Sequence, residues 1–100
     1  KVVCEMGGKN PAVIWDDADL ELALGGVMKG AFGATGQRCT ATSRLILHEA
    51  IADKFLKMLL AETAKIKVGN GLDKTVTMGP AVDESQLKTN LDYIDIAKKE

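Results

Sequence analysis

Two side chains of this chain have the chemistry and the neighbours that nucleophilic and general-base catalysis require. Cys39 stands among small and polar residues that leave its thiol accessible, and the adjacent Arg38 favours the thiolate form. Glu5 is a carboxylate at the end of an apolar run, directly before Gly7–Gly8, and could accept a proton from water there. Judged by residue type alone, a loop cysteine or a strand-end glutamate is more often structural than catalytic, so both interpretations stay open.

The other cysteine and the single histidine are expected to be structural. Cys4 lies in an apolar run and is predicted to pack as a small hydrophobic residue. A disulfide between Cys4 and Cys39 is one alternative, but two free thiols in a reducing cytoplasm are the simpler interpretation. His48 ends an apolar run and is predicted to end a strand. No CxxC or HExxH spacing occurs, so no metal site is predicted.

The composition limits the size of the fold and the classes of partner. The 100 residues are 46% hydrophobic and 27% charged, which is typical of a globular segment with one modest core. The net charge is −1, so neither a nucleic acid nor a membrane surface is an expected partner. The chain begins at Lys1 without a signal-peptide pattern, and we therefore expect it to be part of a longer polypeptide.

Strands and helices alternate in the predicted secondary structure. The predicted strands are Val2–Glu5, Ala12–Trp15 and Arg44–Glu49, the second of them an apolar run typical of a strand buried on both faces. The predicted helices run from Asp16–Asp17 to Thr35–Gly36, from Ile51 to Lys67, and onward from Asp83. This alternation predicts an α/β fold with a parallel sheet.

Each predicted helix has one apolar side and an identifiable end. The apolar positions are Leu20, Leu24, Val27, Met28 and Ala31 in the first helix, Ile51, Phe55, Met58, Leu59 and Ile66 in the second, and Leu87, Leu91 and Ile94 in the third. The first helix also contains several glycines, which indicate that another element packs closely against it. Gly69–Gly71 is expected to end the second helix, and Asp83 with Gln86 has the spacing of a capping box.

The segments around the two reactive residues resemble the signatures of the NAD(P)-dependent aldehyde dehydrogenase superfamily. Cys4–Pro11 is similar to the family's glutamate signature, except that Cys4 replaces an aliphatic or small residue. Phe32–Cys39 keeps the F-x-x-x-G-Q-x-C frame of the cysteine signature, with Cys39 following Glu5 by 34 positions. Further similarities at Ser43–Arg44, at Gly69, and from Gly79–Pro80 to Gln86 extend the resemblance over the whole chain.

The resemblance implies a domain position and a mechanism. Residues 1–8 correspond to the junction from the cofactor-binding domain, which carries the catalytic glutamate, and residues 9–100 to the N-terminal portion of the catalytic domain. Cys39 then corresponds to the nucleophile, which attacks an aldehyde to form a thiohemiacetal and, after hydride transfer to the nicotinamide, a thioester. The Cys39 backbone N–H helps to bind the oxyanion. Glu5 corresponds to the base that activates the hydrolytic water.

The resemblance assigns further roles around these two residues. Met6 and Gly7 correspond to residues whose backbone faces the nicotinamide of NAD or NADP. Gln86 corresponds to a residue that reaches the nicotinamide ribose, or serves in the capping box alone. Arg38 and Thr40 flank the substrate entrance, and Arg44 anchors structure. Most of the cofactor site and an oxyanion-binding asparagine correspond to positions outside these 100 residues.

Several expectations concern the whole protein. The run from Gly36 to Arg44 is most similar to enzymes for semialdehydes that carry a carboxylate, such as 2-oxoglutarate semialdehyde. The segment alone is expected to be inactive and to self-associate, and the parent is expected to be a homo-dimer or homo-tetramer. Two alternatives remain: a CoA-acylating relative, which retention of Glu5 disfavours, and a non-catalytic structural relative with Cys39 as an ordinary loop thiol.

Overall fold

The computed structural model describes residues 1–100. In chain order its elements are β1 (Asn10–Ile14), α1 (Leu20–Phe32), η1 (Gly33–Gly36), β2 (Thr42–Leu47), α2 (Glu49–Thr63) and α3 (Glu84–Ala97). The chain divides into two units, Lys1–Lys67 and Val68–Glu100, and each is described by itself.

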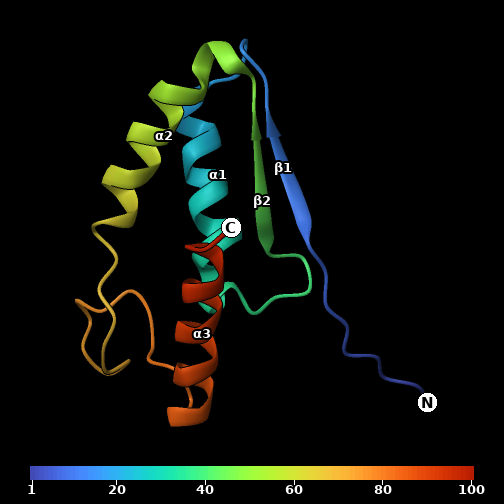
Figure 1. The fold of residues 1–100 in the computed structure, drawn as a ribbon, viewed down its shortest axis with the longest axis vertical. Helices are drawn as coiled ribbons and strands as arrows, with labels where there is room; N and C mark the ends of the chain where they lie inside the picture. Colours follow the sequence, from blue (N-terminus) through green and yellow to red (C-terminus); the bar gives the residue numbers. More distant parts are fainter. The chain divides into compact units, whose positions relative to one another are not determined.

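The first unit is built on a parallel pair of strands. β1 and β2 pair from Pro11 opposite Arg44 to Ile14 opposite Leu47, with a register shift between Asn10 and Pro11. Figure 1 shows the two strands side by side, with α1 and α2 together on one side of them. Because a parallel pair needs a crossover connection, the chain passes through α1 between the two strands. The predicted α/β class and parallel sheet are therefore confirmed.

The core of this unit lies between the strands and the two helices. Phe55 on α2 is fully buried, and it clusters with buried Ile14, Leu24, Val27 and Ile51. Most of the predicted apolar positions of α1 and α2 belong to this cluster or pack against it, namely Leu20, Leu24, Val27, Met28, Ile51, Phe55, Met58 and Leu59. The helical periodicity therefore identified the inward sides of both helices correctly.

The strand β1 is buried on one face only, which corrects the prediction of a strand buried on both faces. Ile14 points into the core, whereas Val13 and Trp15 are each 59% exposed. Ile46, the partner of Val13 on β2, is 52% exposed. The reason is that both helices lie on the same side of the two strands, so side chains that alternate to the other side remain uncovered.

The first predicted strand, Val2–Glu5, is absent. Residues 1–9 have no regular secondary structure, and Val2 and Val3 are 87% and 78% exposed. Figure 1 shows this segment as an extended tail that leads into β1. A strand is defined by hydrogen bonds to a neighbouring strand, and the apolar run has no partner here.

The N-cap of α1 is Asp19, three residues after Asp16, the first residue of the predicted start. The amide of Ala18 donates to the carbonyl of Trp15 at 3.2 Å, so a turn occupies the segment after β1. Asp19 is the N-cap, and its Oδ1 accepts hydrogen bonds from the amides of Glu21 and Leu22, both at 3.1 Å. The correct residue type was predicted for the cap, but the turn moves the start to Asp19.

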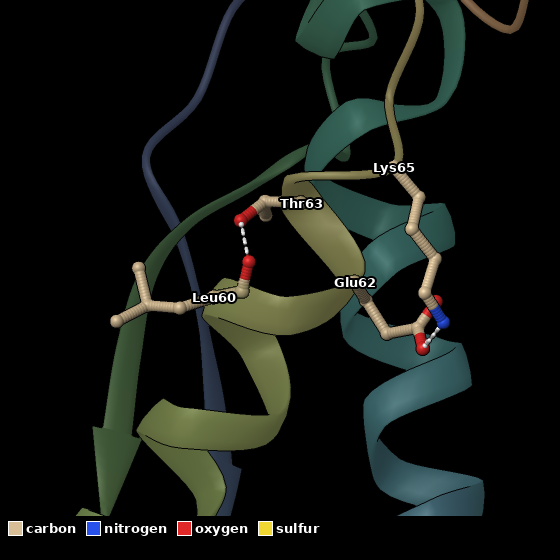
Figure 2. Close-up of polar contacts among 4 residues, drawn as sticks. All are labelled: Leu60, Glu62, Thr63 and Lys65. Carbon is tan, nitrogen blue, oxygen red and sulfur yellow. Dashed lines mark hydrogen bonds and ion pairs between the residues drawn. The ribbon is translucent and has the colours of Figure 1, made fainter.

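The helix α2 also differs from its predicted range, at both ends. His48 is its N-cap, with Nδ1 accepting a hydrogen bond from the Ala50 amide at 3.3 Å, and its ring packs edge-on to Trp15 at a centroid separation of 4.9 Å. At the other end the Thr63 hydroxyl donates to the Leu60 carbonyl at 3.0 Å, and Lys65 pairs with Glu62 (Figure 2).

Local hydrogen bonds end α2 at Thr63, before the chain reaches Gly69–Gly71. The Lys65 and Ile66 amides bond to carbonyls three residues earlier, at 3.1 Å each, and this tightens the turn after Thr63. Gly69–Gly71 lies well beyond the last helical residue, so the prediction that these glycines end the helix is wrong.

In the second unit, Gly69 forms part of a loop that closes on itself. Its amide donates to the Met78 carbonyl at 3.0 Å, beside an isolated bridge between Val68 and Met78. Asp83 caps α3 through the Gln86 amide at 2.8 Å, as predicted, but the Gln86 side chain bonds to Asn90 at 2.8 Å. The reciprocal half of the capping box is therefore absent. The predicted inward positions Leu87, Leu91 and Ile94 are about half exposed, at 50%, 52% and 50%.

Close packing against the glycines of α1 is confirmed at one position. A Cβ on Gly30 would lie 2.7 Å from the Thr42 hydroxyl oxygen, at the start of β2. Gly25 and Gly26 have nothing within 4 Å of such a Cβ. The close approach of helix to strand therefore rests on Gly30.

Candidate active site around Cys39

Cys39 occupies a tight turn between η1 and β2. The Ala41 amide donates to the Arg38 carbonyl at 2.9 Å, which closes a four-residue turn with Cys39 as its second residue. The thiol is exposed and free, as is that of Cys4. The prediction of two free cysteines is confirmed, whereas the prediction that Cys4 packs in the interior is wrong because the segment around it is uncovered.

The chain reaches this turn through three consecutive left-handed residues. The φ angles of Ala34, Thr35 and Gly36 are 52°, 57° and 72°, a region that favours glycine. The Thr35 hydroxyl donates to the Ala34 carbonyl at 2.7 Å, and the Gln37 side chain donates to that hydroxyl. A Cβ on Gly36 would lie 2.9 Å from the Ala31 carbonyl oxygen. Local bonds and the glycine together reverse the chain between α1 and Cys39.

A side-chain amide joins the Cys39 turn to the segment that carries Glu5. Asn10 Nδ2 donates to the Cys39 carbonyl at 2.8 Å and to the Ala41 carbonyl at 3.3 Å. The backbone approaches closely at the same place, since a Cβ on Gly8 would lie 2.9 Å from the Cys39 carbonyl oxygen. Asn10 was not among the predicted site residues, although it lies inside the glutamate signature and is the first residue of β1.

Arg44 makes a second connection between the same two segments. Its Nε donates to the Lys9 carbonyl at 3.1 Å, and its Nη2 donates to the same oxygen. The guanidinium therefore holds the backbone just before β1, which agrees with the structural role expected for Arg44. It also lines an apolar hollow of about 150 Å³ between α1, β2 and α2 that includes neither Glu5 nor Cys39.

Glu5 lies in the exposed tail before this connection. Its side chain makes no hydrogen bond or ion pair, and the residue is exposed. The expectation of a carboxylate at the end of a buried strand is wrong, because no strand forms there. The structure brings together residues 8–10 and 39–44, and Glu5 precedes the first of these segments by three positions.

The residues assigned to the cofactor differ in how well they fit that role. Met6 is 75% exposed and nothing lies within 4 Å of a Cβ on Gly7, so their backbone is open to a planar ring. Gln86 belongs to the second unit, where its amide is engaged with Asn90. Met6 and Gly7 are thus accessible, whereas the side-chain NH₂ of Gln86 is already bonded to Asn90.

Two further residues flank the nucleophile. The Arg38 guanidinium folds back toward Gly33, with its central carbon 3.9 Å from the position of a Cβ there. Thr40 is exposed in the turn that contains Cys39. Thr40 is therefore open to a substrate that approaches the thiol, whereas the Arg38 guanidinium rests against Gly33.

None of the helices combines the length and the apolar character that a membrane-spanning segment needs. The Thr75 backbone amide, followed by the Thr75 side chain, lowers the pKa of Asp73 below the ordinary 3.8. The geometry around Cys39 therefore rests on backbone bonds and on the side chains of Asn10 and Arg44.

A protein-family model matches the sequence along the entire chain. The model is that of the aldehyde dehydrogenase family, and it matches residues 1–100. Among curated proteins, an alpha-ketoglutaric semialdehyde dehydrogenase from Bacillus subtilis is 48% identical over 100 residues, which are 100% of this chain and 20% of that protein. A betaine aldehyde dehydrogenase from Brucella anthropi is 41% identical over 99 residues, 99% of this chain and 20% of that protein.

Solved structures agree with these sequence matches. A betaine aldehyde dehydrogenase from Staphylococcus aureus in complex with NAD+ has a TM-score of 0.89 and 42% identity, covering 95% of this chain and 19% of that one. Another structure of this enzyme contains NAD+ and a BME-modified cysteine, with the same TM-score, identity and coverage. The chain thus spans about a fifth of the length of the relatives it matches.

Proposed function

The chain belongs to the aldehyde dehydrogenase family, and we propose that the protein containing it oxidises an aldehyde to a carboxylic acid with Cys39 as the nucleophile. The observation that carries this proposal is the position of Cys39. It is an exposed free thiol on a turn that two hydrogen bonds attach to the segment with the glutamate signature.

The thiolate of Cys39 attacks the aldehyde carbon, and a C–S bond forms as the carbonyl π electrons move to oxygen. The resulting oxyanion is bound in part by the Cys39 backbone N–H. The Arg38–Ala41 turn orients the peptide that carries this N–H, because its carbonyl is the one that accepts the Ala41 amide. The BME-modified cysteine of the Staphylococcus aureus enzyme supports the presence of a reactive thiol in this family.

NAD(P)+, when bound, accepts the hydride that leaves the substrate carbon and so converts the thiohemiacetal to a thioester. On the signature match, the backbone of Met6 and Gly7 would border the nicotinamide, and the Gln86 side chain would contact the ribose. Both assignments rest on the signature match, together with the open backbone at the first two positions.

Glu5 takes a proton from water, which attacks the thioester carbon and releases the carboxylic acid and the Cys39 thiolate. A base has to alternate between the water and a position clear of the hydride path. The exposed, unpaired carboxylate of Glu5, followed by Gly7 and Gly8, supports such mobility.

The substrate we favour is a semialdehyde that carries a carboxylate. The 48% identity to the alpha-ketoglutaric semialdehyde dehydrogenase supports this class. Arg38 beside the nucleophile places a fixed positive charge where an anionic substrate would enter, with Thr40 as a hydrogen-bonding neighbour. Betaine aldehyde, the substrate named for the relatives at 41% identity, is a cation that Arg38 would repel.

The setting of this activity is a larger protein. We propose that residues 1–8 belong to the junction with a cofactor-binding domain, that residues 9–100 begin the catalytic domain, and that the 100 residues alone produce no NAD(P)H. We further propose a cytoplasmic homo-dimer or homo-tetramer. Two exposed free thiols support a reducing compartment.

Three proteins test the proposal: the full-length protein, its Cys39→Ala variant and its Glu5→Gln variant. The full-length protein should reduce NAD(P)+ with 2-oxoglutarate semialdehyde faster than with betaine aldehyde, and Cys39→Ala should be inactive. Glu5→Gln should lower steady-state turnover about 10²–10⁴-fold while an acyl adduct on Cys39 accumulates, visible by mass spectrometry. Undiminished turnover in Cys39→Ala would refute the assigned nucleophile, and a product that forms only with CoA would favour the acylating alternative.

A further inference from the structure

Both peptide groups that flank Cys39 are held by hydrogen bonds. The carbonyl of the Arg38–Cys39 peptide accepts the Ala41 amide at 2.9 Å. The carbonyl of the Cys39–Thr40 peptide accepts Asn10 Nδ2 at 2.8 Å. Because the backbone has only two soft dihedral angles per residue, holding both planes fixes φ and ψ of Cys39 and therefore the direction of its Cα–Cβ bond.

The two bonds differ in origin. The first is internal to the turn and would form wherever the turn forms. The second comes from a residue 29 positions earlier, so it also fixes the turn relative to the start of β1. The 3.3 Å bond from the same amide to the Ala41 carbonyl adds a second point of attachment on the other side of Thr40.

The local sequence explains why a side chain makes these bonds. The register shifts between Asn10 and Pro11, so the regular strand pairing is interrupted where β1 begins. Pro11 has no amide hydrogen to offer to β2. The Asn10 amide supplies two N–H donors at this point, and it reaches the carbonyls of Cys39 and Ala41, which lie on either side of Thr40 in the turn.

The backbone of Gly8 also limits the space around the Cys39 carbonyl. A Cβ at Gly8 would lie 2.9 Å from the Cys39 carbonyl oxygen, closer than real Cβ contacts. The Cys39 carbonyl is thus held by a donor from Asn10 and limited by the backbone of Gly8. The two constraints come from the same three-residue stretch.

We propose that Asn10 is a positioning residue for the reaction: its carboxamide holds the Cys39 peptide so that the thiol and the oxyanion-binding N–H keep one orientation. This inference rests on the proposed function of Cys39 as the nucleophile. Asn10 does not touch the substrate. It acts through the backbone of Cys39, and therefore affects the formation of the thiohemiacetal more than the binding of the aldehyde.

The test uses the full-length protein and four variants. Asn10→Asp keeps the shape of the side chain but replaces the donating NH₂ with an oxygen, which faces two carbonyls. Asn10→Ala removes the group altogether, and Gly8→Ala would place a Cβ 2.9 Å from the Cys39 carbonyl oxygen and 3.1 Å from Asn10 Nδ2. Asn70→Ala is the matched control, since Asn70 also bonds to the backbone, through the Leu72 amide at 3.0 Å, but does so in the second unit.

Two measurements test separately whether Asn10 holds the Cys39 turn and whether this contact affects the reaction. Amide hydrogen exchange of the peptide containing residues 36–42 should accelerate in both Asn10 variants and remain unchanged in Asn70→Ala. The pre-steady-state burst of NAD(P)H should slow about 10- to 100-fold in Asn10→Asp and Asn10→Ala, with KM within about two-fold of the unmodified protein. A misplaced nucleophile should slow the burst without changing KM. A general loss of folding would instead lower the burst amplitude and leave its rate constant unchanged.

A burst rate in Asn10→Asp within two-fold of the unmodified protein would overturn the proposal. Unchanged amide hydrogen exchange at residues 36–42 would also overturn it, because the Asn10 side chain would then not hold the turn. If either variant fails to fold, Gly8→Ala decides by the same burst measurement. If Cys39→Ala retains activity, the proposed function fails, while the exchange measurement still reports whether Asn10 holds the turn.

Discussion

The side-chain amide of Asn10 lies 2.8 Å from the backbone carbonyl oxygen of Cys39, across 29 positions of sequence. The hydrogen bond couples the tail that carries Glu5 to the turn that carries the proposed nucleophile. Arg44 couples the same segments through the Lys9 carbonyl. The two functional signatures are therefore joined by contacts of residues that neither accept nor donate protons in the reaction.

Gly36→Ala should destabilise the first unit by about 1–2 kcal/mol, because alanine is disfavoured at φ of 72° and its Cβ would meet the Ala31 carbonyl oxygen at 2.9 Å. Gly25→Ala is the control. Its Cβ meets nothing within 4 Å and its position is inside α1, so this variant should be more stable by about 0.5–1 kcal/mol. Denaturant unfolding of both variants measures the difference, and an equal effect of the two would contradict the left-handed role of Gly36.

Phe55→Ala should destabilise the first unit by about 3–5 kcal/mol, since Phe55 is fully buried and its removal leaves a cavity in the only core cluster of the unit. The neighbouring Leu56 has the same helical environment but is 48% exposed, and Leu56→Ala should cost less than about 1 kcal/mol. Thermal unfolding followed by circular dichroism distinguishes the two. A similar loss in both would mean that the inward side of α2 has been assigned incorrectly.

The uncovered face of the two strands should drive association of the isolated 100 residues. Val13 and Ile46 are paired across the strands and are 59% and 52% exposed. Ile46→Thr keeps a β-branched side chain but reduces the apolar surface, and should lower the association constant. Light scattering at tens of micromolar should give a dimer or larger species for the unmodified segment and a lower mass for the variant. A monomeric unmodified segment would refute this expectation.

The pKa of Asp73 should be below 3.8 in a carboxyl titration by nuclear magnetic resonance, because the Thr75 amide donates to its Oδ1 at 2.8 Å. A lowered pKa in the folded state means that the ionised form is the stabilised one. The contribution to stability is therefore present above the unfolded value and is lost as the pH falls through the lower folded value. Thr75→Val removes only the side-chain bond, so the pKa should rise but stay below 3.8. No rise would assign the effect to the backbone amide alone.

Periodicity and residue type predicted the elements that depend on local interactions. The sides of α1 and α2 that face the core are the predicted ones, with Leu24, Val27, Ile51 and Phe55 buried. Burial of one side of a helix requires apolar residues at this spacing. Cap residues were predicted less well, since Asp19, and not the earlier aspartates, begins α1, and His48 caps α2. A turn after Trp15 and the end of β2 decide these positions, and both depend on packing of neighbouring elements.

The candidate site likewise has residues that the sequence identified and features that it did not. The sequence alone identified Cys39 and Glu5 as the reactive types, and the F-x-x-x-G-Q-x-C frame and the family match agree on the class of protein. It predicted a strand at Val2–Glu5 because the run is apolar, but strand formation requires a partner that this run does not have. No periodic pattern pointed to Asn10, because a single side-chain bond leaves no repeating signal.

Chemical identity and local preference are properties of residues and short segments, so the sequence by itself pointed to Cys39 and Glu5 as candidate reactive residues and identified the inward sides of α1 and α2. The tertiary structure decided which face of β1 is covered and which residue holds the Cys39 peptide. Both of these depend on distances between segments that are remote in the chain. Only the pairing of β1 with β2 brings Asn10 to Cys39, and that pairing exists only in the folded unit.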